Sequence, residues 1–203
     1  MHGDVVRAGP GDVAVLAAVL ARAFDDDPLS LYLFGSPHRR ATGLRRFFSL
    51  QLRHTYLRHG EVWTTADRAG AALWAPPTMP RPGLADLVRI LPVVPTLSVW
   101  GRKAPDVAQL LAAYERARPT TPHFYLGTLG TDPDRQGRGV GSALLTVVLD
   151  RLDDEGLPAY LESSKQRNLA FYARYGFEVT GSIAVRRGPT LWLMWREPRL
   201  PRR

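Results

Sequence analysis

The spacing of apolar positions predicts a chain in which strands and helices alternate. Between residues 12 and 24, Val13, Leu16 and Leu20 fall on one stripe of an amphipathic helix, and an acidic run followed by Pro28 should end that helix. The remaining predicted elements are strands at 4–8, 61–65, 69–75, 123–131, 158–163, 177–185 and 191–195, an aromatic turn at 31–34, and helices at about 39–58, 140–155 and 167–175. This order predicts a single mixed α/β domain over residues 1–203.

The segment 76–118 is the least regular part of the chain and lies between the third and fourth predicted strands. It contains two helical patterns with prolines at their borders. We expect a helical insertion in the domain here, and a basic tail at 197–203.

The composition excludes several kinds of chemistry. With 203 residues, 45% of them hydrophobic and 23% charged, the chain resembles an ordinary globular protein. It contains no cysteine, which excludes disulfides, cysteine-bound metals and a catalytic thiolate, and we expect no metal site. The first residues lack the pattern of a signal peptide, and the most apolar stretch, 87–100, is interrupted by Arg89, Pro92 and Pro95. We therefore expect a cytoplasmic protein with no membrane partner.

A net charge of +8 raises the question of nucleic-acid binding. All 27 basic residues except Lys103 and Lys165 are arginines, and they are scattered along the chain rather than gathered with aromatic residues in a recognition motif. We therefore expect no nucleic-acid partner. The charge suits attraction of an acidic small molecule or a phosphate-bearing cofactor.

Candidate chemistry concentrates where a predicted strand meets a predicted helix. Gly137, Gly139 and Gly141 stand at every second position, beside Arg135 and Arg138. Glycine allows close approach of the backbone to a ligand, and the first N–H groups of a helix are unpaired at its positive end. The pattern favours a phosphate or pyrophosphate site over an ordinary tight turn, which needs fewer glycines.

Two common nucleotide-binding motifs fit poorly. No Gly-Lys-Ser/Thr ending of a P-loop is present. A Rossmann Gly-x-Gly-x-x-Gly would place Ser142 or Leu144 at its third glycine, although Glu162 does mimic the ribose-binding acid. Since no second βαβ half follows, a nucleotide oxidoreductase is a weak alternative.

Two motifs carry a resemblance to a known family. Gln136-x-x-Gly139-x-Gly141 resembles the acetyl-CoA signature of the GNAT superfamily of N-acetyltransferases, and the run from Asn168 through Phe171-Tyr172 to Gly176-Phe177 resembles its second signature. Within the superfamily, the second half of the chain is similar to puromycin N-acetyltransferases, whereas the first 120 residues match only loosely. The resemblance implies a mixed, mainly antiparallel sheet flanked by helices, with the helical insertion between the third and fourth strands.

The resemblance also implies acetyl-CoA as cofactor. Backbone groups of Leu129 to Thr131 would pair with its pantetheine arm, the amides from Gln136 to Ser142 would hold its pyrophosphate, and Asn168 would hydrogen-bond the arm. The candidate cofactor residues are Leu129, Gly130, Thr131, Arg135, Gln136, Gly137, Arg138, Gly139, Val140, Gly141, Ser142, Asn168, Phe171 and Tyr175.

By the same resemblance, an acetyl group passes directly to an amine in a ternary complex. Tyr172 would protonate the departing thiolate, with a core aromatic residue on an amphipathic helix as the alternative. Glu162 is the candidate base, with a surface carboxylate or a partner of Arg167 as the alternative, and His123 is a weaker candidate. An α-amine, with a pKa of about 7.7–8.0, needs less help from a base than a lysine amine at about 10.4.

The expected acceptor is a small-molecule primary amine, with a puromycin-like aminoacyl compound favoured and antibiotic resistance as the implied role. Its candidate pocket residues are Phe24, Asp27, Tyr32, Trp74 and Tyr125, an acid among aromatic walls. Phe24 and Trp74 could equally be core residues. The insertion would cover this pocket or form a dimer surface, so both a monomer and a homodimer are open. Acetylation of a protein lysine or N-terminus, and a non-catalytic acyl-CoA sensor, are the alternatives.

Overall fold

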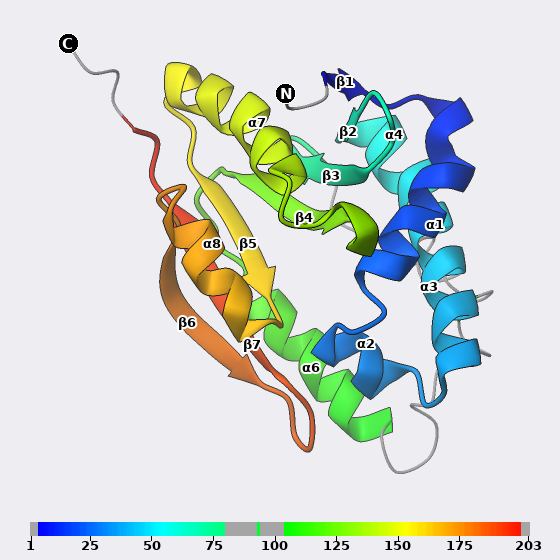
Figure 1. Cartoon of the computed structure of the whole chain (residues 1–203). Helices are drawn as coiled ribbons and strands as arrows, with labels where there is room; N and C mark the ends of the chain where they lie inside the picture. Colours follow the sequence, from blue (N-terminus) through cyan, green and yellow to red (C-terminus); the bar gives the residue numbers. More distant parts are fainter. Residues whose placement is uncertain (1–3, 80–92, 94–103, 200–203) are drawn as a thin grey trace.

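The computed structural model describes residues 4–79, 93 and 104–199, which form a seven-stranded sheet with helices on both faces (Figure 1). The strands are β1 (Val5–Arg7), β2 (Glu61–Thr65), β3 (Gly70–Ala75), β4 (Phe124–Thr131), β5 (Ala159–Ser163), β6 (Glu178–Ala184) and β7 (Thr190–Arg196). Their order is β1-β2-β3-β4-β5-β7-β6, and among the described strands only β4 and β5 pair in parallel. The expected mixed, mainly antiparallel α/β fold is confirmed.

Helices connect most of the strands. They are α1 (Val13–Ala23), α2 (Pro28–Leu33), α3 (Pro37–Leu50), α4 (Leu57–His59), α6 (Ala104–Ala117), α7 (Val140–Glu155) and α8 (Leu169–Ala173). The helix expected at 39–58 spans Pro37 to His59, but Gln51–Tyr56 in its middle is π-helical. Of the two helical patterns in 76–118, α6 lies within the described residues and the other lies outside them.

The segment expected to be an aromatic turn at 31–34 is instead the end of a short helix, α2. Asp27 caps this helix, because its Oδ1 accepts hydrogen bonds from the backbone N–H groups of Leu29 at 2.9 Å and Ser30 at 3.1 Å. Pro28 follows at the first helical position, where no N–H is needed. The cap, rather than any helical spacing of apolar residues, starts this helix.

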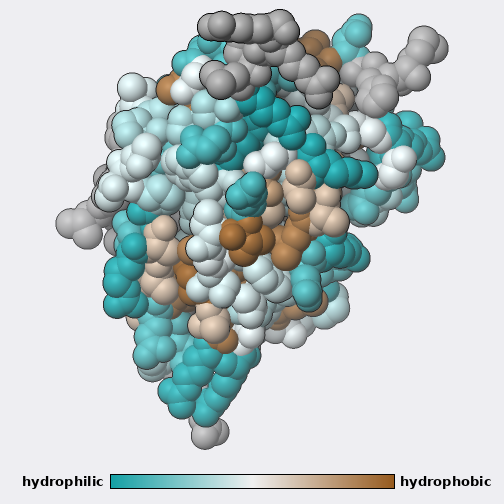
Figure 2. All heavy atoms as spheres, turned by 90° about the vertical axis from the view of Figure 1, so that its left-hand side faces the viewer, coloured by the Kyte–Doolittle hydropathy of each residue, from teal (hydrophilic) through white to brown (hydrophobic). Residues whose placement is uncertain are grey.

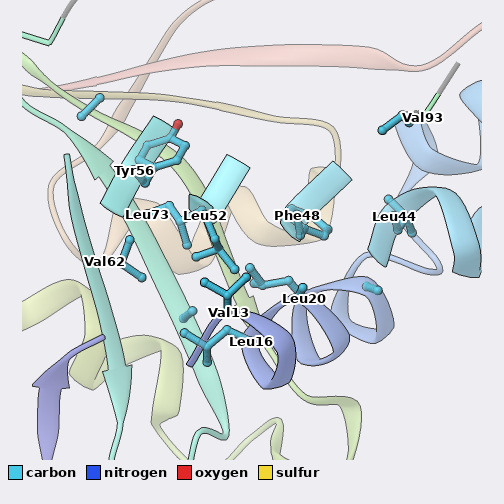
Figure 3. Packing of buried hydrophobic residues seen from close by; sticks show 14 of the residues in the cluster. Val13, Leu16, Leu20, Leu44, Phe48, Leu52, Tyr56, Val62, Leu73 and Val93 are labelled. Atoms are coloured by element: carbon cyan, nitrogen blue, oxygen red, sulfur yellow. The ribbon is translucent and has the colours of Figure 1, made fainter. Parts of the chain in front are cut away.

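Alternating residues of β3 divide the core between the two faces of the sheet. Leu73 points toward α1 and α3, where it packs with Leu16, Leu20 and Phe48 (Figure 3). Trp74 points the other way, into the core under α7. The α7 side also contains Leu144, Leu145, Val148, Leu149 and Leu152, all buried. The sheet is therefore covered on both faces, and β3 is buried along its whole length.

The surface of the described residues carries few large apolar side chains. Val15, Leu31 and Val179 are the exposed ones among them. Figure 2 shows one face, seen from the side of β6 and α8, where hydrophilic side chains surround small hydrophobic areas. Within residues 4–79 and 104–199, no helix combines the length and hydropathy of a membrane-spanning segment.

Candidate active site

The sheet opens between its two parallel strands. Register pairs join β4 to β5 only from Phe124–Leu126 to Ala159–Leu161, whereas β4 continues to Thr131 and stays paired with β3 along its other edge. Figure 1 shows the two strands diverging beyond this point. The backbone of β4 from Gly127 to Thr131 therefore faces β5 without a partner strand among the described residues. Such an edge can accept an extended ligand as if it were another strand.

A cleft of about 600 Å³ lies at this opening. It is bounded by the end of α1, the end of β4, the glycine-rich turn, the loop after β5, and α8. The predicted residues that line it are Phe24, Asp27, Leu129, Gly130, Thr131, Arg135, Gln136, Gly137, Gly139, Val140, Gly141, Ser142, Asn168, Phe171 and Tyr172. Arg138 is exposed outside the cleft, and Tyr175 packs behind it against Phe171, with ring centroids 5.3 Å apart.

The glycine-rich turn presents free backbone N–H groups to the cleft. Gly137 and Gly139 adopt left-handed conformations, with φ of 72° and 81°, which glycine adopts without strain. The N–H groups from Gly137 to Ser142 meet no acceptor within the described residues, and we call them the amide cradle. The Gln136 amide is already engaged with the Pro133 carbonyl at 3.3 Å, so the cradle begins one residue later than expected.

These features fit acetyl-CoA. Free N–H groups at the start of α7 suit the pyrophosphate, and the unpaired edge of β4 suits an arm that contains amide groups. The cleft also contains Arg135, Lys165, Arg167 and Arg174, against a single lining acid, Asp27. Its charge therefore matches an anionic ligand. Lys165 and Arg174 were not predicted, because their places depend on how distant loops meet.

The acidic run at 25–27 joins the loop after α1 to α3 and to the loop after β5, in addition to the cap that Asp27 provides for α2. Asp25 accepts two hydrogen bonds from Arg40 on α3, at 2.9 and 3.3 Å. Asp26 pairs with Lys165 and with Arg167 at 2.7 Å; burial opposes its ionisation, but these two cations hold its pKa below the ordinary value. Arg167 is thus the partner of Asp26 rather than of Glu162.

Tyr172 lies on α8 and faces the cleft. Its ring packs against Phe171 and Phe177, and its hydroxyl meets no acceptor within the described part of the chain. Burial, together with the negative charge of Asp27, raises the pKa of this hydroxyl above its ordinary value. Asp27 itself accepts a hydrogen bond from Ser164 in addition to capping α2. The Tyr172 hydroxyl therefore stays protonated and can act as a proton donor.

Glu162 lies on the opposite face of the sheet from Leu161 and outside the cleft. The register that pairs Leu126 with Leu161 puts it level with Gly127, where β4 leaves β5. Its side chain is half-buried, and the loss of contact with water raises the pKa of its carboxyl group, although the Tyr125 and Tyr160 hydroxyls and the charge of Arg118 oppose that shift. It is not the surface carboxylate of the alternative interpretation.

Four tyrosines surround this carboxylate, and its charge raises the pKa of each hydroxyl in addition to the effect of burial. They are Tyr56 from the π-helical segment, Tyr114 from α6, Tyr125 from β4 and Tyr160 from β5. We call these tyrosines and Glu162 the Glu162 cluster. Tyr56, Tyr114, Tyr160 and Arg118 were missed at the level of sequence, because nothing in the local sequence distinguishes them from ordinary core or surface residues.

The predicted acceptor residues do not form one pocket. Phe24 and Asp27 line the cleft, whereas Tyr125 belongs to the Glu162 cluster. Tyr32 packs under α6 with Leu110, and its hydroxyl donates to the Arg186 carbonyl at 3.4 Å. Trp74 is fully buried in the core under α7, so its core interpretation is the one that the structure supports.

Comparisons with known proteins agree with this geometry. The model of the acetyltransferase (GNAT) family matches residues 101–177. An uncharacterised N-acetyltransferase of Schizosaccharomyces pombe is 28% identical over 206 residues, which cover 95% of this chain and 82% of that protein. A mycothiol acetyltransferase of Acidimicrobium ferrooxidans is 40% identical over 73 residues, and the match spans 34% of this chain but only 21% of that protein.

Solved structures extend the likeness to the whole fold. A Corynebacterium glutamicum protein described as histone acetyltransferase HPA2 and related acetyltransferase superposes with a TM-score of 0.72 and 28% identity over 99% of both chains. A paiA N-acetyltransferase from Thermoplasma acidophilum, in complex with coenzyme A, has a TM-score of 0.58 and 12% identity, with 97% of this chain and 99% of that chain covered. At that identity the second likeness concerns the fold alone.

The fold and its opened parallel strand pair define an α/β acetyltransferase that uses acetyl-CoA. More narrowly, residues 101–177 are similar to the GNAT family of N-acetyltransferases, and the S. pombe relative shows that this similarity extends along most of the chain. The finer resemblance to puromycin N-acetyltransferases stays a prediction, as do the oligomeric state and the cytoplasmic location.

Proposed function

We propose that this protein transfers the acetyl group of acetyl-CoA to the primary amine of a small molecule, with both substrates bound at once. The single observation that carries the proposal is the opening between β4 and β5. It has the amide cradle and Tyr172 on one side of the sheet and the half-buried Glu162 on the other. A chain without cysteine has no thiol for an acyl-enzyme, which favours direct transfer.

The donor side follows from the cleft. The amide cradle binds the pyrophosphate, and Leu129 to Thr131 present an unpaired strand edge to the pantetheine arm. Asn168 and Phe171 line the same cleft beside the arm. Acetyl-CoA supplies an activated acetyl group: the amine nitrogen forms a bond to the acetyl carbon as the carbon–sulfur bond breaks.

Two side chains of this chain move the protons. Tyr172 donates its hydroxyl proton to the departing sulfur, since burial keeps this hydroxyl protonated. Glu162, directly or through water, takes the proton that the amine loses. Its raised pKa brings the carboxylate closer to neutral pH and makes it a better base than an exposed glutamate.

For the acceptor we propose a primary α-amine attached to an aromatic or apolar body, of which a puromycin-like aminoacyl compound is the example. The support is that aromatic side chains lie both in the cleft and around Glu162. Phe24 lines the cleft, and the Glu162 cluster adds four tyrosine rings. An α-amine also has a lower pKa than a lysine amine and so needs a weaker base.

The test measures release of free coenzyme A thiol from acetyl-CoA in the presence of puromycin, other small amines and peptides. The wild-type protein is compared with Tyr172→Phe and Glu162→Gln. We expect amine-dependent release, slowed at least about tenfold by either substitution. Glu162→Gln should also remove the rise of the rate with pH that deprotonation of the base produces.

Other outcomes separate the alternatives. Turnover with peptides alone would replace the small-molecule acceptor by a protein lysine or N-terminus. Tight binding of coenzyme A without turnover of any acceptor would contradict the enzymatic proposal and favour an acyl-CoA sensor. Unchanged rates in Tyr172→Phe would remove this residue from the acid role.

A further inference from the structure

A second cavity lies at the end of β4 opposite the amide cradle, and binding of the donor does not account for it. Its volume is about 170 Å³, which is smaller than a site for a drug-sized ligand. Pro76, Pro77 and Met79 after β3 form an apolar wall, and the segment from Arg118 to His123 forms the opposite one. The ring of Tyr125 closes the space between them.

One positive charge dominates this second cavity. Arg118 is the only charged residue among the described ones that line it, and its guanidinium carbon lies 5.4 Å from the centre of the Tyr125 ring. It forms no ion pair with any acid in the described ranges. A half-exposed guanidinium with free donors, set between apolar walls, suits a carboxylate, which accepts two parallel hydrogen bonds from it.

His123 adds no second charge to the cavity. Its Nδ1 lies 2.6 Å from the Thr121 carbonyl oxygen, and burial lowers its pKa, with a further contribution from Arg118. A neutral imidazole therefore sits next to the guanidinium. With Arg118 as its one charged group among the described residues, the cavity suits a ligand with a single negative charge better than a polyanion.

The same tyrosine ring connects this cavity to the Glu162 cluster. Arg118 stands over the face of Tyr125, whereas the hydroxyl end of Tyr125 approaches Glu162. Tyr160 stacks on Tyr125 with centroids 6.0 Å apart, and its hydroxyl, like that of Tyr125, approaches Glu162. The two tyrosine rings therefore lead from Arg118 to the carboxylate.

We infer that the acceptor is an α-amino acid with an apolar or aromatic side chain, which binds along Tyr125. Its amine lies toward Glu162 and Tyr160, its carboxylate pairs with Arg118, and its side chain contacts Pro76, Pro77 and Met79. The inference rests on the proposed function and narrows it, because a puromycin-like amide carries the α-amine but lacks the carboxylate. Arg118 thus acts as the residue that determines specificity.

The test compares three acceptors that share one body: phenylalanine, phenylalanine amide and phenethylamine. Values of kcat/KM with acetyl-CoA are measured for the wild type, for Arg118→Gln and for a control, Arg116→Gln, which changes an exposed arginine in the last turn of α6, two residues before Arg118. We expect the wild type to prefer phenylalanine over both other acceptors by at least about tenfold. Arg118→Gln should lose that preference through a higher KM for phenylalanine, and Arg116→Gln should keep it.

Calorimetric titration of phenylalanine into the protein gives a readout that is independent of turnover. Binding should weaken at least about tenfold in Arg118→Gln and stay unchanged in Arg116→Gln. The inference is overturned if the amide or the amine is acetylated as well as phenylalanine, or if Arg118→Gln keeps the preference. If no amine raises thiol release above background, the proposed function itself has failed, which is a different result.

Discussion

Gly127 lies where β4 leaves β5, and its missing side chain makes room for the hydroxyl of Tyr56. A Cβ built at this glycine would lie 1.9 Å from that hydroxyl oxygen and 2.9 Å from the ring carbon that carries it. In Figure 3 the Tyr56 hydroxyl points away from the other side chains of the α1 and α3 core. One position on the strand therefore brings a residue of the π-helical segment into the Glu162 cluster.

At the residue scale we predict that Gly127→Ala destabilises the protein by about 1–3 kcal/mol, because the new methyl group overlaps Tyr56. Adding Tyr56→Phe removes the overlapping oxygen and should recover part of the loss, so the two changes should not be additive. Urea unfolding of the single and double variants measures both effects. A Gly127→Ala variant as stable as the wild type would refute this account of the glycine.

The sequence predicted the position of a contiguous motif, but not the position of side chains that depend on contacts between distant segments. The glycine-rich turn is a continuous segment that offers unpaired backbone N–H groups, so spacing alone indicated where they would lie. Tyr32 and Trp74 were assigned to an acceptor pocket because they are aromatic, but the face on which a side chain lies depends on pairing that sequence does not show. Tyr56 and Arg118 reach the site from segments far from β5 along the chain.

At the scale of elements, the end of β7 is fastened to the end of α7 through a buried arginine. Arg196 donates through Nη2 to Asp153 at 2.6 Å and through Nε to the Tyr175 carbonyl at 2.7 Å. Asp153 also accepts the Arg199 N–H at 2.7 Å. The helix that begins at the amide cradle is thereby anchored at its other end. The periodicity of apolar residues predicted α7 itself, but not this anchor.

We predict that Asp153→Asn destabilises the protein by about 3 kcal/mol at pH 7, because it leaves Arg196 buried without its counter-charge. Burial opposes ionisation of Asp153, but the hydrogen bonds from Arg196 and Arg199 lower its pKa in the folded state. The stabilisation is therefore complete above the unfolded-state pKa of about 3.9 and is lost as pH falls through the lower folded-state pKa.

Thermal unfolding from pH 7 down to acid pH checks both parts of this prediction. The difference between the wild type and Asp153→Asn should shrink as the pH falls below about 4. Asp154→Asn, at the exposed neighbouring position, is the matched control and should change stability little at any pH. A gap between wild type and Asp153→Asn that is the same at acid and neutral pH would show that the ion pair is not its source.

At the scale of the whole molecule, the net charge of +8 is shared unequally between the two hollows. The cleft at the strand opening contains four basic side chains, of which two pair with Asp26, whereas Arg118 is the one charged residue described in the lining of the second cavity. Under the proposed function, the positive net charge attracts the anionic donor from a distance, and the basic side chains of the cleft add to that attraction.

We predict that salt weakens the binding of coenzyme A severalfold between about 0.05 and 0.5 M ionic strength, because screening shortens the reach of these charges. Pantetheine, which lacks the phosphates, is the matched ligand and should bind with an affinity that salt hardly changes. Titration calorimetry at both ionic strengths measures the two constants. Equal salt dependence of the two ligands would show that the phosphates do not meet these charges.

The amide cradle is made of main-chain groups, and only Gly137 and Gly139 need a particular residue type, because of their left-handed conformations. Under the proposed function, changes of side chain at its other positions would leave the binding of the donor largely intact. The groups proposed to meet the acceptor are side chains, contributed by the π-helical segment, α6, β4, β5 and the segments that follow β3 and α6. A lineage of such proteins can thus exchange one amine for another by single substitutions and inherit the acetyl chemistry unaltered.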